Sequence, residues 1–143
     1  MEHARHLRVA VRDEDIDPSA MLEEVSRPDS GAIALFLGTV RDHSENRTGV
    51  THLVYEAYTE HVESKIREIM GEAADKWPIQ SAAVEHRIGR VDLGGTSVAV
   101  AVSTAHRGDA FEAARYLIDE LKARAPIWKQ ENWPGGEEWI EGA

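Results

Sequence analysis

The stretch Thr96–Glu131, TSVAVAVSTAHRGDAFEAARYLIDELKARAPIWKQE, decides the fold because it holds a strand, a helix and a helix stop in succession. The apolar run Thr96–Ser103 predicts a buried strand. Asp109, with Glu112 three residues later, has the spacing of a capping box, and amphipathic spacing then predicts a helix. A buried strand followed at once by an amphipathic helix indicates a helix that packs on a sheet.

Pro126 ends this helix and separates two lysines. Because proline has no backbone N–H to donate, the helix should end near Arg124 or the residue after it. Lys122 then lies on the last helical turn, and Lys129 lies on the segment that leaves the helix. Basic side chains at a helix C-terminus commonly only complement the helix dipole. The two amines form a site only if the chain folds back after Pro126.

Cationic and titratable side chains also follow two of the predicted strands. His106 and Arg107 lie at the turn between the strand and the helix, and Arg41 follows the apolar strand Ala32–Leu37 and Gly38. Such turns present backbone amides to anions, and the planar fork of arginine fits a phosphate group. Each residue alone is an ordinary loop residue. Together, in a chain of net charge −10, they predict a local anion-binding pocket.

The remaining pattern predicts an α+β or mixed α/β fold with two sizeable helices. Asp17 and Pro18 are an N-cap and first-turn pair for a short helix. The polar, turn-rich segment Arg41–Gly49 is expected to be a mobile loop. The other expected elements are strands at Arg5–Val11, Val50–Tyr58 and Ala82–Ile88, and a helix whose buried face runs from Val62 to Trp77 before Pro78.

Composition limits the possible classes of protein. A length of 143 residues with 42% hydrophobic content fits one domain spanning residues 1–143. The chain has no long apolar run and no N-terminal apolar signal region, so a cytoplasmic location is expected. The 26 acidic and 16 basic residues argue against general nucleic-acid binding. The histidines form no metal-binding motif, so neither a metal nor another cofactor is expected.

Four segments give the chain a recognisable resemblance. FLGTVRDH (36–43), HRIGRVDLGG (86–95), the run Ser103–Glu131 and EEWIE (137–141) resemble, in order and spacing, the large catalytic subunit of molybdopterin synthase, the MoaE family. The resemblance covers about Gly31 to Ile140. It implies a single-domain α/β-hammerhead-like fold with a mixed or antiparallel sheet and two main helices.

The resemblance also implies an activity and its partners. The family inserts two sulfurs into cyclic pyranopterin monophosphate and so makes the dithiolene of molybdopterin during molybdenum cofactor biosynthesis. The sulfur donor is a small ubiquitin-like subunit whose C-terminal Gly-Gly ends in a thiocarboxylate, and a homodimer of the large subunit forms the centre of a heterotetramer. This chain has no cysteine, so a partner must bring the sulfur.

The resemblance also implies a role for each residue that matches a functional position of the family. Lys122 and Lys129 match the two essential lysines of the family, and an amine near other cations in a partly dry pocket has a lowered pKa. The resemblance implies that Lys122 acts in the chemistry and that Lys129 orients the substrate. The positions expected to bind the pterin phosphate or the donor's terminus, or to flank them, are Thr39, Val40, Arg41, His106, Arg107, Gln130 and Glu131.

Other interpretations of the same residues remain open. The basic cluster would equally serve a non-catalytic module that binds a partner's Gly-Gly tail or a phosphorylated metabolite. A phosphate-ester hydrolase with His106 as base is a weaker alternative, because it lacks a nucleophile and metal ligands. Trp128, Trp133 and Trp139 could stack on a pterin ring, but core packing or a dimer interface is the commoner role of such residues.

Overall fold

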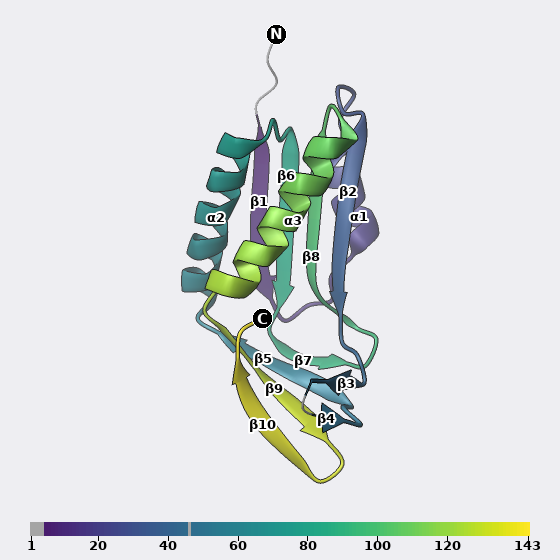
Figure 1. Cartoon of the computed structure of the whole chain (residues 1–143), viewed down its shortest axis with the longest axis vertical. Coiled ribbons are helices and arrows are strands. Elements are labelled where there is room, and N and C mark those ends of the chain that lie inside the picture. The colour runs from purple at the N-terminus through teal and green to yellow at the C-terminus, as the bar shows by residue number, and fades with distance from the viewer. Residues whose placement is uncertain (1–4, 46) are drawn as a thin grey trace.

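The computed structural model describes residues 5–45 and 47–143, which form a helix-covered sheet above a smaller sheet that crosses beneath it (Figure 1). The elements follow one another in the order β1 (His6–Arg12), α1 (Pro18–Val25), β2 (Ala32–Thr39), β3 (His43–Ser44), β4 (Arg47–Thr48), β5 (His52–Ala57), α2 (Thr59–Lys76), β6 (Ser81–Arg87), β7 (Gly89–Asp92), β8 (Thr96–Thr104), α3 (Arg107–Arg124), β9 (Ile127–Trp133) and β10 (Gly136–Glu141).

The upper sheet has the strand order β1-β6-β8-β2. Strand β1 pairs with β6 in parallel, and the other two pairings are antiparallel, so the sheet is mixed. Helices α2 and α3 cover one face, and the short α1 covers part of the other (Figure 1). With two 18-residue helices, the structure confirms the predicted α+β fold with two main helices.

Strand β8 shows why the sheet carries helices on both faces. Its residues from Ser97 to Thr104 are all buried, as expected for a strand covered on both sides. The valines Val98, Val100 and Val102 pack in the large core cluster with α2 and α3, while Ala99 and Ala101 pack in a smaller cluster with α1. Small side chains on the second face let the short α1 approach the sheet closely.

The lower sheet has the order β10-β9-β5-β7, and all of its pairings are antiparallel. The sequence pattern missed β7, which is short, and β10, which is mostly exposed. It also missed β9, because only a segment leaving the helix was expected after Pro126. The predicted loop Arg41–Gly49 also proved partly wrong, because β3 and β4 pair there as a small hairpin. Residue 46 lies outside the described residues.

Helix α1 begins as predicted, with the Asp17 side chain accepting a hydrogen bond from the backbone amide of Ala20 at 3.2 Å and Pro18 in the first turn. Helix α3 begins differently from the prediction. Its N-cap is His106, which makes no side-chain capping bond, and Asp109 lies inside the first turn. The predicted capping box is therefore wrong. The helix ends at Arg124, as Pro126 predicted.

The buried face of α3 is formed by alanines together with Leu117, Ile118 and Leu121, whereas Phe111 is 69% exposed. Leu117 and Leu121 are each 1% exposed and pack against α2 and the upper sheet. Burying such a side chain contributes roughly 2 kcal/mol of hydrophobic stabilisation. No helix in the described part of the chain is both long and apolar enough to span a membrane.

We predict that Leu117→Ala lowers the free energy of unfolding by about 3 kcal/mol, because it leaves a cavity in a fully buried part of the core. Urea denaturation followed by circular dichroism measures the change. Phe111→Ala on the same helix is the matched control and should cost less than about 0.5 kcal/mol, because its ring is mostly in water. Equal losses for the two variants would contradict this assignment of the helix faces.

Candidate functional site

The end of α3 and the start of β9 bring the two lysines into one pocket. Ala125 caps the helix in an extended conformation, and the chain enters β9 directly after Pro126. Residues alternate between the faces of a strand, so Lys129 lies on the same side of β9 as the buried Ile127 and Glu131. That side is turned toward the last turn of α3, where Lys122 lies, and both lysines line one cavity of about 380 Å³.

We call this cavity the two-lysine pocket. The end of β2 supplies one wall with Thr39, and Arg41 follows it. The lower sheet supplies a second wall through β5 and β9, and the β3–β4 hairpin supplies a third. The lining residues are Phe36, Leu37, Gly38, Thr39, Arg41, His43, Ser44, Val50, Leu53, Tyr55, Ser97, Val98, Lys122, Lys129, Glu131 and Ala143.

The pocket changes the acidity of Lys129. Burial lowers the pKa of this amine below its usual value, and the neighbouring charge of Lys122 lowers it further. Glu131 acts in the opposite direction, and Arg41 adds a smaller lowering effect. An amine with a lowered pKa exchanges its proton nearer to neutral pH, which suits it to acid–base chemistry.

Glu131 is held by residues that the sequence analysis missed. Its buried carboxylate accepts a hydrogen bond from the Ser44 hydroxyl at 3.2 Å and from the Arg47 Nε at 3.3 Å. The Arg47 guanidinium also reaches Glu138 and lies 3.6 Å from the centroid of the Trp133 ring. One arginine therefore fastens the hairpin to the lower sheet. Residues 84 positions apart in the chain give no local pattern that would predict this contact.

A segment of the chain itself lies in the pocket. The Lys122 Nζ donates to the backbone carbonyl oxygen of Ala143 at 3.5 Å, and the Gly142 amide donates to the Ile127 carbonyl at 2.8 Å. Gly142 has a φ of 109°, which glycine adopts without the steric cost of a side chain. The pocket thus accepts a stretch of backbone with small side chains and presents one carbonyl to Lys122.

The residues expected in the site are only partly brought together within one chain. Thr39, Arg41, Lys122, Lys129 and Glu131 line the two-lysine pocket. Val40 is buried next to it, where its backbone pairs with Gly94 and Gly95. Gln130 lies on the opposite face of β9, and its side chain accepts a hydrogen bond from Asn132 at 3.0 Å.

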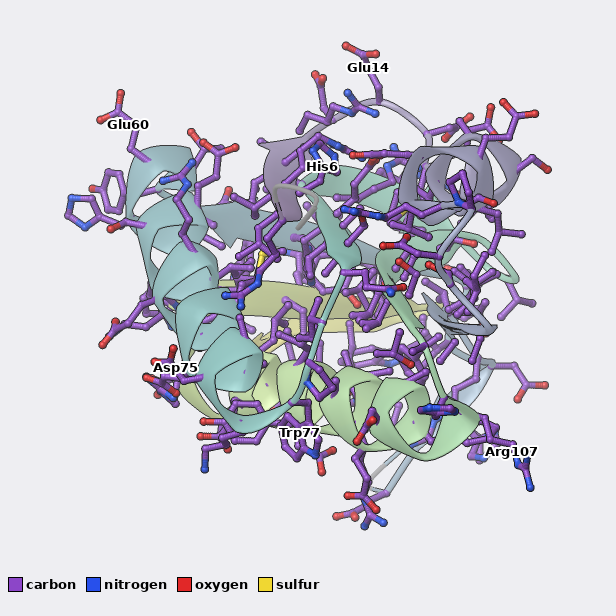
Figure 2. The ribbon with its side chains drawn as sticks, turned by 90° about the horizontal axis from the view of Figure 1, so that it is seen from above. His6, Glu14, Glu60, Asp75, Trp77 and Arg107 are labelled. Atoms are coloured by element: carbon purple, nitrogen blue, oxygen red, sulfur yellow. The ribbon has the colours of Figure 1, made fainter. Side chains whose placement is uncertain are left out.

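His106 and Arg107 lie at the other end of α3. Fifteen residues separate Arg107 from Lys122, so at 1.5 Å per residue they stand about 22 Å apart along the helix axis. Figure 2 shows Arg107 at the outer end of this helix, pointing away from the body of the molecule. Neither residue lines the two-lysine pocket of its own chain.

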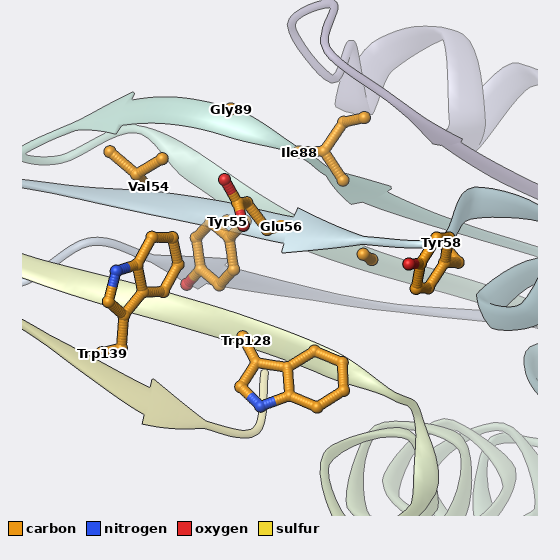
Figure 3. A pocket seen from close by; sticks show the side chains of 9 residues that line it. Val54, Tyr55, Glu56, Tyr58, Ile88, Gly89, Trp128 and Trp139 are labelled. Atoms are coloured by element: carbon orange, nitrogen blue, oxygen red, sulfur yellow. The ribbon is translucent and has the colours of Figure 1, made fainter.

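A second cavity, of about 670 Å³, lies on the opposite face of β5 and β9 (Figure 3). Trp128 and Trp139 line it, and they are 40% and 47% exposed, so core packing does not account for them. Glu56 is the single ionisable carboxylate in a lining that is otherwise apolar, aromatic or backbone. Because no cationic side chain lines it, this cavity is less suited than the two-lysine pocket to acid–base chemistry or to binding an anion. No group of metal-binding side chains occurs among the described residues.

Comparisons with known proteins show what this chain is similar to. A sequence profile described as MoaE protein matches residues 11–124. The chain is 50% identical over 123 residues to the molybdopterin synthase catalytic subunit of Thermoplasma volcanium, covering 86% of this chain and 89% of that protein. It is 41% identical over 125 residues to the protein of the same name from Bacillus subtilis, covering 87% and 79%.

Two solved structures share the fold. Molybdopterin synthase from Staphylococcus aureus superimposes with a TM-score of 0.85 at 34% sequence identity, over 91% of this chain and 94% of that one. A complex of subunits 1 and 2 of the molybdopterin-converting factor from Helicobacter pylori gives a TM-score of 0.75 at 22% identity, over 92% and 89%. At that identity, the second match supports the fold alone.

We predict that Lys129→Met raises the melting temperature at pH 7 by about 1 to 3 °C, since it removes a partly buried charge that lies close to Lys122. The folded pKa of Lys129 is lowered, so the unfolded chain holds this proton more tightly and protonation opposes folding. The gain should shrink as the pH rises through the folded pKa, where the native lysine becomes neutral.

Differential scanning calorimetry between pH 6 and pH 10 measures this effect. The control is Lys65→Met, which removes a surface lysine paired with Glu68 at 2.9 Å and should change the melting temperature by less than about 1 °C. A lower melting temperature for the Lys129 variant at pH 7 would show that its charge stabilises the fold.

Proposed function

The chain belongs to the MoaE family of molybdopterin synthase catalytic subunits, and on that premise we propose that it is a sulfurtransferase that makes molybdopterin. Two sulfurs pass from the thiocarboxylated Gly-Gly terminus of a small ubiquitin-like subunit to cyclic pyranopterin monophosphate. The product carries the dithiolene that later binds molybdenum. We place this reaction in the cytoplasm and assign it to one domain formed by the whole chain.

One observation carries the proposal: the backbone carbonyl of Ala143 lies against the Lys122 amine inside the two-lysine pocket. A Gly-Gly tail has the same small cross-section as the Gly142–Ala143 segment and ends in a carbonyl-like group. A tail that replaced this segment would bring its terminal carbon next to Lys122. The chain has no cysteine, which agrees with a sulfur brought by the partner.

The chemistry assigns a role to each basic side chain. When sulfur leaves the tail, the bond between the acyl carbon and sulfur breaks, and an oxygen from water takes the place of sulfur on that carbon. Lys129, whose pKa is lowered, accepts the proton of that water and orients the substrate. Lys122 contacts the acyl group, and Arg41 binds the phosphate of the pterin. Thr39 and Glu131 complete the wall of the site.

His106 and Arg107 reach such a pocket only from a second copy of the chain. Strand β2 lies at the edge of its sheet, and its side chains Ile33 and Leu37 are 40% and 36% exposed. The edge backbone and these apolar side chains are available for pairing with a second β2. In an antiparallel pair, the start of one β2 lies beside the end of the other.

This pairing supplies the missing anion-binding groups. Ala32, at the start of β2, pairs with Thr104 just before His106, while the opposite end, Thr39, lines the two-lysine pocket. Arg107 of one copy would then approach Arg41 of the other. We therefore propose a homodimer that completes both pockets and binds two small subunits as a heterotetramer.

Lys122→Ala tests the function. We expect the native chain, mixed with cyclic pyranopterin monophosphate and thiocarboxylated small subunit, to add two sulfurs to the pterin, as measured by mass spectrometry. The variant should lose at least about 100-fold in turnover, because an acid–base or acyl-contacting group has gone, while it still binds the small subunit. The control Lys65→Ala should retain full activity.

Two results would reject this account. Equal turnover of the native chain and the Lys122 variant would move the chemistry away from the two-lysine pocket. Binding of the small subunit with no product from the native chain would favour the second candidate, a non-catalytic module that holds the Gly-Gly tail. The observation that favours that candidate is the same small-residue segment in the pocket, which needs no chemistry to explain it.

Mixing two impaired variants, assayed at a substrate concentration well below KM, tests the shared pocket. Arg107→Ala alone should weaken substrate binding, and Lys122→Ala alone should abolish turnover. After co-refolding of the two variants in equal amounts, about one pocket in four should hold a native Lys122 and a native Arg107 from different copies. Recovery of about a quarter of the native activity supports the proposed homodimer, whereas no recovery would contradict it.

A further inference from the structure

Tyr55 is the buried phenol of the two-lysine pocket. It lies on β5, and its cross-strand partner on β9 is Lys129. Directly opposed residues on neighbouring strands have Cβ atoms about 5 Å apart on the same face, so the two side chains leave the sheet side by side on the pocket face. Tyr55 is 4% exposed and lines the same pocket as Lys122.

The ring of Tyr55 is held by a histidine that stays uncharged. His86 is 1% exposed, and its ring meets that of Tyr55 edge to face, with the centroids 5.0 Å apart and an interplanar angle of 78°. The His86 Nδ1 lies 2.7 Å from the Arg87 carbonyl oxygen. A carbonyl oxygen can only accept, so Nδ1 carries the proton of the neutral ring.

Burial, with a smaller contribution from the charge of Lys122, lowers the pKa of His86 to about 4, although the bond to the Arg87 carbonyl acts in the opposite direction. His86 therefore fixes the Tyr55 ring at neutral pH without adding a positive charge beneath the two lysines.

The Tyr55 phenol keeps its proton and lies beside Ser97. Burial raises the pKa of Tyr55, while a hydrogen bond with Ser97 partly offsets that rise. The Ser97 hydroxyl also donates to the Gly38 carbonyl oxygen at 3.3 Å. Serine has a single hydroxyl proton, and in this geometry it goes to Gly38. A ligand oxygen in the pocket would therefore compete with the Ser97 oxygen for the phenolic proton.

The Ser44 hydroxyl on the β3–β4 hairpin is already committed. Ser44 donates to the buried Glu131 carboxylate at 3.2 Å. Lys122 and Lys129 are titratable amines that must also orient substrate and move protons. A neutral donor with fixed orientation is the group that stabilises a developing oxyanion without changing its own charge.

We propose that Tyr55 is a further catalytic residue, whose phenol donates a hydrogen bond to the oxyanion formed on the donor's acyl carbon. This inference rests on the proposed sulfur transfer. Once the thiocarboxylate sulfur has added to an electrophilic carbonyl carbon of the acceptor, with the carbon–oxygen π pair moving onto that oxygen, a thioester joins the tail to the acceptor. Water adds to the acyl carbon, its proton passes to Lys129, and the carbonyl electron pair moves onto oxygen.

The tetrahedral intermediate then collapses. The bond between the acyl carbon and sulfur breaks, and the sulfur leaves with the bonding pair on the acceptor, while the tail keeps a carboxylate. Tyr55 donates to the oxygen that carries the negative charge between these two events. The same oxyanion forms if the Lys122 amine, instead of water, attacks the acyl carbon.

Tyr55→Phe keeps the ring against His86 and removes only the hydroxyl. We expect kcat to fall about 100-fold with KM changed less than about 3-fold, the pattern of a contact made mainly in the transition state. Mass spectrometry of quenched reactions should also show the thioester adduct between tail and acceptor accumulating in the variant. Thermal melting of both proteins checks that the variant is folded.

Tyr116→Phe is the matched control. The Tyr116 hydroxyl donates to Glu72 at 2.7 Å, so this variant loses a hydrogen-bonded phenol outside the pocket and should keep native turnover. Ser97→Ala should produce a smaller loss of kcat than Tyr55→Phe, because it removes the partner and leaves the donor.

The outcomes separate the two proposals. A native chain that makes no product rejects the proposed function and the role of Tyr55 with it. A native chain that makes product, beside a Tyr55→Phe variant of equal kcat and with no adduct, rejects the inference alone. A raised KM with unchanged kcat would likewise overturn it, because the hydroxyl would then contribute only to ground-state binding.

Discussion

The break between α3 and β9 is the constraint on which the rest of the structure depends. Pro126 cannot continue the helix, so the chain leaves α3 one turn after Lys122 and joins the lower sheet beside β5. The packing of Leu117 and Leu121 fixes one side of this junction, and the pairing of β9 with β5 fixes the other. Two amines that are seven positions apart in the chain thereby line one pocket.

Electrostatics explain why such a pocket can bind an anion and why it lowers the stability of the fold. The chain carries a net charge of −10, yet Arg41, Lys122 and Lys129 gather where water is partly excluded. Crowded cations bind an anionic substrate and shift proton exchange toward neutral pH. Glu131, fastened by Arg47, limits the repulsion between them. The neutral His86 behind Tyr55 prevents a further charge from destabilising the site.

Sequence reasoning found the elements that depend on local chemistry. Apolar runs located the buried strands, Asp17 located the start of α1, and Pro126 located the end of α3. It missed contacts between residues that lie far apart in the chain. The bond between Arg47 and Glu131 joins residues 84 positions apart, and Tyr55 enters the pocket only through its pairing with Lys129. The separation of Arg107 from the pocket likewise follows from the length of α3, which places Arg107 and Lys122 near opposite ends of that helix.

A crystal structure of the chain bound to a small subunit ending in Gly-Gly tests the central claim most directly. The account predicts that the tail enters the two-lysine pocket, displaces the Gly142–Ala143 segment and places its terminal carbonyl oxygen about 3 Å from the Lys122 Nζ. A tail seated instead in the aromatic cavity beside Trp128 and Trp139, with Ala143 still against Lys122, would contradict it.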